Sequence, residues 1–197
     1  MCTITATTAL LALVASSAPH AFSLTELERQ RLVAHLEVTA SWLVDEVSGL
    51  TPAQLQFRRA PNEWSILQVV EHLVVVGPIY WQDLQKAMKA PPGSRSNAST
   101  DADILWYGID RTRRESAIPT EVPKGQLRDL RTGLEAYRKQ HAQLLQYART
   151  TTDDLRSHFV ERQGSDAYQW ALLISTHEQR HILQIREIKA APKFPKK

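Results

Sequence analysis

The chain has 197 residues, of which 43% are hydrophobic and 23% are charged. These values are typical of one globular domain that forms its own core, and they argue against a disordered protein. The net charge of +3 is small, and no basic stripe interleaved with aromatic residues is present, so the sequence does not indicate nucleic-acid binding. Cys2 is the single cysteine, which excludes an internal disulfide and a cysteine-rich zinc site.

Residues 1–22 have features of a secretory signal peptide. The first 23 residues contain no Asp, Glu, Lys or Arg, and Ala9–Ala15 is a short apolar run followed by small residues up to Ala21. The run is too short to span a membrane as a helix. We therefore expect export to the periplasm or the exterior, with cleavage after Ala21. The alternative is a disordered or misassigned start on a cytoplasmic protein.

Two helical patterns follow the leader. The first covers about residues 23–48, and its apolar stripe advances by three and four residues. The stripe consists of Leu32, Leu36, Thr39, Leu43 and Val47. The second covers residues 65–88 and begins with a capping box, in which Ser65 is the N-cap and Gln68 the third helical residue. Pro78 lies inside this pattern and predicts a kink or an exposed edge.

Two further helices are predicted in the second half of the chain. Residues 126–150 keep a three-four rhythm from Leu127 to Ala148, and residues 165–190 carry a stripe from Trp170 to Ile188. Between the second and third patterns, residues 94–125 are polar and irregular. A connection of this length inside a compact domain is usually functional or mobile.

The four patterns predict an all-α four-helix bundle over residues 24–190, with residues 94–125 as a long crossover. Residues 191–197 are predicted to form a basic tail. Residues 52–60 and 155–162 are candidates for short strands. The crossover contains Trp106, Tyr107 and the basic cluster Arg111–Arg114, which makes it a candidate lid or substrate-recognition segment; the alternative is a solvated loop.

The strongest functional signal is the HExxH sequence at residues 177–181. His177 and His181 are four residues apart, so on a helix both rings lie on one face and can chelate one metal ion. His72 lies on the apolar stripe of the second helix. Three histidines that point into one bundle would leave ring nitrogens without partners unless a metal binds them. Three imidazoles suit Zn, Ni, Fe or Cu and leave a coordination position open.

Three neighbouring residues are candidates for accessory roles. Glu178 is expected at the rim of the metal face, where it would be a catalytic helper that orients a ligand or accepts a proton; the alternative is a surface or salt-bridged carboxylate. Gln184 returns to the same face and is a candidate partner of a ligand or substrate; the alternative is a residue that only caps the core. His141 lies on the stripe of the third helix, and we interpret it as a hydrogen-bonded core residue rather than a fourth ligand.

Two known classes of metal protein fit poorly. A zinc protease of the metzincin type needs a glycine and a histidine downstream of HExxH, where this chain has Gln184 and Glu187. A di-iron bundle needs two Glu-x-x-His motifs, and only Glu178–His181 provides one.

Two segments carry a resemblance to a known family. Residues 62–73 place Trp64-Ser65 before a helix that contains His72-Leu73, and residues 177–185 read H-x-x-x-H-x-x-Q-I. Together they resemble the DinB-like superfamily, which includes the YfiT-like metal-dependent hydrolases. The resemblance implies an up-up-down-down bundle, often a homodimer, with a divalent metal on His72, His177 and His181.

The resemblance also implies a class of activity. Members include thiol S-transferases that use bacillithiol, mycothiol or glutathione, proteins described as hydrolases, and proteins without the metal residues. We therefore expect a metal-dependent hydrolase or thiol transferase with a small-molecule substrate, and no partner in nucleic acid or the membrane interior. An exported protein would not meet a cytosolic thiol, which argues against the transferase. A metal-binding or stress-associated protein without turnover, and a bundle with purely structural histidines, are the alternatives.

Overall fold

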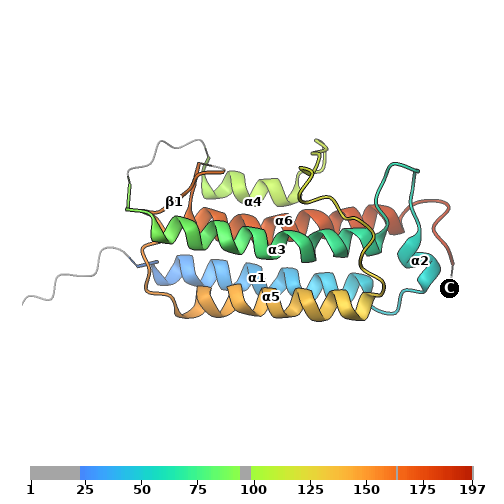
Figure 1. Cartoon of the computed structure of the whole chain (residues 1–197), viewed down its shortest axis with the longest axis horizontal. Coiled ribbons are helices and arrows are strands. Elements are labelled where there is room, and N and C mark those ends of the chain that lie inside the picture. The colour runs from blue at the N-terminus through green and yellow to red at the C-terminus, as the bar shows by residue number, and fades with distance from the viewer. Residues whose placement is uncertain (1–22, 94–98, 163, 197) are drawn as a thin grey trace, which may run out of the picture.

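The protein is a four-helix bundle with a short helix packed on one side (Figure 1). The computed structural model describes residues 23–93, 99–162 and 164–196, so the predicted leader at 1–22 lies outside the described residues. The bundle consists of α1 (Glu26–Val47), α3 (Ile66–Lys89), α5 (Leu130–Thr150) and α6 (Ala167–Lys189). Shorter elements are α2 (Pro52–Gln56), α4 (Asp101–Ile109), β1 (Phe159–Val160) and β2 (Ser165–Asp166). The predicted all-α bundle is thus confirmed.

The helices run up-up-down-down when they are followed around the bundle in the order α1, α6, α3, α5. Glu46, near the end of α1, bonds to Arg186 and Lys189 near the end of α6, so these two helices are parallel. Glu71, near the start of α3, bonds to the backbone that precedes α5, so α3 and α5 are parallel. Because parallel neighbours cannot be joined by a tight turn, the chain from α3 to α5 crosses the length of the bundle (Figure 1).

Each helix begins at a polar side chain that accepts a backbone N–H of its first turn. The caps are Thr25, Thr51, Ser65, Thr100, Asp129 and Asp166. The predicted Ser65–Gln68 capping box is present. The third long helix starts at Leu130 rather than at residue 126, because Asp129 caps it and the carboxylate of Glu71 binds the N–H groups of residues 124–126 instead.

Pro78 lies inside α3, and the helix continues through it to Lys89. Proline has no N–H, so the carbonyl of Val74, four residues earlier, loses its usual donor. The side chain of Gln140 on α5 replaces that donor, with Nε2 at 3.1 Å from the Val74 oxygen. Gly77 leaves room for this amide, since a Cβ there would lie 2.4 Å from Gln140 Oε1.

The core follows the predicted stripes closely. The buried residues of α1 are the five that its periodicity predicts, from Leu32 to Val47. In α6, buried residues extend around most of the helix, because α1 and α3 pack on one side and α4 on the other. Within the described ranges, no helix is both long enough and apolar enough to cross a membrane.

The crossover differs from the irregular segment that the sequence predicts, because it contains α4. Thr100 and Asp103 form a capping box at its start. Gly108 allows a close approach to α6, since a Cβ there would lie 2.9 Å from the Cβ of Thr176. The helix has only nine residues, and Trp106 and Ile109 face solvent, so its sequence has no clear amphipathic period.

Three other segments also have their own structure. Residues 52–56 form α2 rather than a strand, whereas β1 lies inside the second strand candidate and pairs antiparallel with β2. The basic C-terminal segment folds back on α2. There the carbonyl of Pro195 accepts a hydrogen bond from Gln54, and Phe194 packs edge-on against Phe57.

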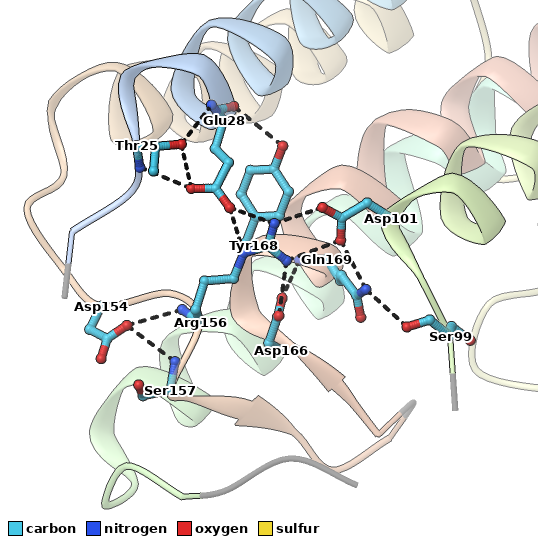
Figure 2. A network of polar contacts seen from close by, with 10 residues as sticks. All are labelled: Thr25, Glu28, Ser99, Asp101, Asp154, Arg156, Ser157, Asp166, Tyr168 and Gln169. Atoms are coloured by element: carbon cyan, nitrogen blue, oxygen red, sulfur yellow. Dashed lines mark hydrogen bonds and ion pairs between the residues drawn. The ribbon is translucent and has the colours of Figure 1, made fainter. Parts of the chain in front are cut away.

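Arg156 joins the first turns of three helices at one end of the bundle (Figure 2). Its guanidinium donates to Glu28 of α1, to Asp101 of α4 and to Asp166, the fully buried N-cap of α6. It also lies over the ring of Tyr168, 4.0 Å from the centroid. Burial alone would lower the pKa of Arg156, but the three carboxylates outweigh it and raise that pKa. One cation therefore balances three anions that would otherwise repel one another.

Replacing Arg156 with methionine is expected to lower the free energy of unfolding by about 2–3 kcal/mol, because the buried carboxylate of Asp166 would lose the guanidinium that now donates to it. The arginine is partly exposed, so the expected value lies below the range for a fully buried pair. Urea denaturation measures the change. Arg131→Met is the matched control, since Arg131 pairs with Glu135 on the surface, and we expect at most about 0.5 kcal/mol there. Equal effects of the two substitutions would contradict the role of the network.

Candidate metal centre

Three histidine rings meet between α3 and α6. His72 comes from the second turn of α3, and His177 and His181 come from successive turns of α6. Within the described residues, these three form the group of side chains with the geometry to hold a metal ion, and their ligand atoms lie within 4.8 Å of one another. The structure therefore brings together the three residues that the sequence predicts as ligands.

The Nε2 atoms of the three rings face a common point. His177 Nε2 lies 3.2 Å from His72 Nε2 and 3.1 Å from His181 Nε2. Nitrogen ligands at about 2.05 Å around a tetrahedral ion are separated by about 3.3 Å. The two distances from His177 Nε2 are thus close to the spacing that one bound ion would impose.

The second ring nitrogens of His72 and His181 show that these two rings direct lone pairs, and not protons, toward this point. His72 Nδ1 donates to the carbonyl of Glu121 at 2.7 Å, and His181 Nδ1 donates to Gln184 Oε1 at 2.8 Å. In a neutral imidazole, a protonated Nδ1 leaves an unprotonated Nε2. At least two lone pairs therefore converge, and the single Nε2 proton that His177 can carry satisfies only one of them. A metal ion fits this donor set, because it accepts all three lone pairs.

The surroundings keep the rings neutral. Burial, together with the nearby His72, Arg180 and Arg162, lowers the pKa of His177 to about 3. Burial and the neighbouring rings likewise lower the pKa of His181 well below its usual value. Burial also lowers the pKa of His72, against the bond to Glu121. Metal binding requires deprotonated ligands, so the site is prepared for an ion at neutral pH.

The same shifts predict that metal-free protein loses stability in mild acid. Below pH 6.5 the unfolded chain protonates His177 while the folded chain does not. The contribution of His177 to the free energy of unfolding is therefore fully present above pH 6.5 and decreases as the pH falls. Between pH 7.5 and 5.5, His177 alone is expected to lower the free energy of unfolding by about 1.4 kcal/mol. Urea denaturation of chelator-treated protein checks this. In His177→Gln the loss should shrink, and an unchanged pH profile in that variant would contradict the assignment.

Aromatic rings form two walls of the centre. The indole of Trp64 is nearly parallel to the ring of His181, with centroids 6.2 Å apart, and it lies 4.9 Å from the ring of His72. The ring of Tyr80 lies 5.4 Å from that of His177. These walls lower the local polarity and restrict the rotamers of the three histidines.

The crossover is bonded to α6 beside the histidines. Arg180, which is buried, donates to the carbonyls of Tyr107, Asp110 and Arg113, and no carboxylate pairs with it among the described contacts. Farther along α6, Arg111 pairs with Glu187 at 2.9 Å. The segment predicted as a lid thus lies beside the centre, and its Glu121 carbonyl contacts His72.

Glu178 is not at the rim of the metal face but points toward α1 and α5. Its carboxylate accepts hydrogen bonds from Tyr137 at 3.0 Å and Thr39 at 3.2 Å, and lies 3.4 Å from His141 Nδ1. Burial disfavours the charged form of His141, but Glu178 outweighs burial and raises the pKa of that ring. His141 is therefore a core residue paired with Glu178 and lies outside the ligand group, as we interpreted it from the sequence.

The sequence alone did not identify several residues around the centre. The role of the Glu121 carbonyl cannot be predicted from the sequence, because every residue has a backbone carbonyl. Glu71 is buried and binds three backbone N–H groups at the end of the crossover. Trp64 was noted only as part of a motif. Its position directly before a predicted N-cap, about two helical turns before His72, is the signal that would place its ring near the three histidines.

Comparison with known proteins places the chain in a family. The model of the DinB superfamily matches residues 25–185. Among solved structures, the chain is similar to YfiT from Bacillus subtilis, described as a probable metal-dependent hydrolase with an unusual four-helix bundle topology. The TM-score is 0.60 at 18% identity, and the match covers 85% of this chain and 89% of YfiT. No curated protein sequence matches significantly. From its bundle and the family match over most of its length, the chain belongs to the DinB superfamily.

Proposed function

We propose that the protein is a metal-dependent hydrolase of a small molecule, with one divalent ion held by His72, His177 and His181. The observation that carries the proposal is the convergence of three Nε2 atoms at 3.1–3.2 Å, with the other nitrogens of two rings bonded to acceptors. The similarity to YfiT supports the class of reaction. Three protein ligands also leave a coordination position for water or substrate, as in catalytic rather than structural zinc sites.

The residues around the centre have separate roles in the proposed reaction. A divalent ion bound here supplies Lewis acidity toward water or a polar group of the substrate. The Glu121 carbonyl and Gln184 fix the tautomers of His72 and His181, so that lone pairs are presented without rearrangement. Trp64 and Tyr80 restrict water around the rings. Arg180 holds the crossover in place beside the centre.

Elemental analysis of the purified full chain, followed by an activity screen, tests the proposal. We expect about one equivalent of Zn, Ni or Fe per chain and hydrolysis of a small ester or amide that stops when the metal is removed. Conjugation of glutathione, bacillithiol or mycothiol to an electrophile would show a thiol transferase instead. Bound metal without turnover in either screen would favour the non-catalytic metal-binding protein, and absence of metal after loading would contradict both metal functions.

A further inference from the structure

The carbonyl that bonds to His72 belongs to an irregular part of the crossover. Glu121 closes a turn in which its N–H donates to the carbonyl of Ile118 at 2.9 Å. Residues 118–120 and Val122 are exposed. A carbonyl in an exposed loop has no helix or sheet to fix its direction, so its bond of 2.7 Å to His72 Nδ1 depends on what anchors residue 121.

The anchor is the side chain of the same residue. Glu121 is only 5% exposed, in contrast to its neighbours, and its carboxylate accepts a hydrogen bond from Nη2 of Arg162. A buried carboxylate is costly unless a cation or several donors compensate its charge. The ion pair therefore ties the middle of the crossover to the turn that follows β1, although the two residues are 41 positions apart.

Arg162 is itself held against α3. Its Nη1 lies 3.5 Å from the carboxylate of Asp83, and its Cζ lies 5.2 Å from the centroid of the Tyr80 ring, within the range of a cation–π contact. The Tyr80 ring in turn lies 5.4 Å from the ring of His177. The guanidinium thus contacts both the residue whose carbonyl bonds to His72 and the ring that packs against His177.

We propose that Arg162 is a positioning residue of the metal centre, which acts on the ligand His72 through Glu121. The ion pair holds residue 121 so that its carbonyl keeps the Nδ1 proton of His72, and the Nε2 lone pair faces the ion. This role rests on the proposed function, because it needs an ion on the three histidines, but it does not depend on which reaction follows. The fixed orientation of the His72 ring is its consequence in metal-free protein.

The zinc affinity of the full chain, measured by competition with a chromogenic chelator, tests the role. Changes to residues that bond a ligand directly weaken metal affinity about 10- to 100-fold. Arg162 acts one step further away, so Arg162→Met should weaken zinc binding about three- to tenfold, and Arg162→Lys, which keeps the charge, should recover part of the loss. Glu121→Gln should have an effect of the same size. The double variant should bind zinc about as well as the weaker single variant, because both changes break one contact.

Two controls separate positioning from general stability. Lys86→Met breaks the ion pair with Glu161, which joins the same turn to α3 at the surface and involves no residue of the crossover. Arg156→Met is expected to destabilise the fold through the network at the first turns of α1, α4 and α6, which includes no ligand histidine. Both variants should therefore keep a zinc affinity within about twofold of the wild type.

A metal-free measurement separates failure of this role from failure of the proposed function. In chelator-treated wild type, the Nδ1–H of His72 should give a low-field proton NMR signal that exchanges slowly with water and is absent in His72→Gln. Exchange should be faster in Arg162→Met but not in Lys86→Met. The role is overturned if Arg162→Met leaves this exchange unchanged, or weakens zinc binding no more than Lys86→Met does. Absence of zinc binding in the wild type would instead contradict the proposed function, while faster exchange in Arg162→Met would still show that Arg162 fixes the His72 ring.

Discussion

His177→Ala is expected to abolish stoichiometric metal binding. His177 Nε2 is the one atom that lies near both other ligand nitrogens, at 3.2 and 3.1 Å, so its removal leaves a two-ligand site. Changes to residues that only support a ligand typically weaken metal affinity 10- to 100-fold. Loss of a ligand itself should exceed that range, and we expect less than about 0.1 equivalent of metal after dialysis against a mild chelator.

Two other buried or half-buried histidines provide matched controls. His35 bonds to Ser175 and Gln179, and His141 pairs with Glu178, and neither belongs to the ligand group. His35→Ala and His141→Ala should therefore retain about one equivalent of metal. If His177→Ala keeps its metal while either control loses it, the assignment of ligands is wrong. If none of the proteins, wild type included, takes up metal, the three rings are a structural cluster.

The sequence predicts the parts of this molecule that depend on periodicity. The stripe of α1 and the ligands on α3 and α6 follow from the 3.6-residue repeat, because the spacing of residues fixes the face of the helix that they share. The same rule explains why His177 and His181 were expected on one face of a helix, where the structure places them. His72 could be added because a histidine on an apolar stripe must find partners inside the bundle.

The parts that depend on contacts between distant segments were not predictable. The bond from His72 to the carbonyl of Glu121 joins residues 49 positions apart and involves the backbone of the crossover. The angular position of Glu178 was known to be about 100° from His177, but which neighbour lies on that side depends on the order of helices around the bundle. Because α5 follows a crossover, its Tyr137 and His141 reach Glu178. The predicted homodimer and the export of the chain stay predictions.

Glu178→Leu is expected to destabilise the fold while leaving metal content unchanged. The carboxylate is 7% exposed and accepts hydrogen bonds from Tyr137 and Thr39, and the charge of His141 faces it. Removing it takes the anion away from the buried ring of His141 and leaves the Tyr137 hydroxyl with only the weak 3.4 Å contact to His141 Nδ1, whereas Thr39 keeps its bonds to α1 and Ser175. The free energy of unfolding should therefore fall by about 2–4 kcal/mol. Glu178→Gln keeps an acceptor oxygen and should lose only about 1–2 kcal/mol.

Denaturation and elemental analysis of the two variants together decide what Glu178 does. A structural partner of α1 and α5 predicts a graded loss of stability, Leu larger than Gln, with about one equivalent of metal in each. The sequence-based hypothesis of a catalytic helper predicts the opposite pattern, because a carboxylate acting at the metal would be needed for turnover rather than for the fold. Wild-type stability in Glu178→Gln together with complete loss of turnover would therefore return Glu178 to the metal site, and would mean that its bonds to Tyr137 and Thr39 are broken when substrate binds.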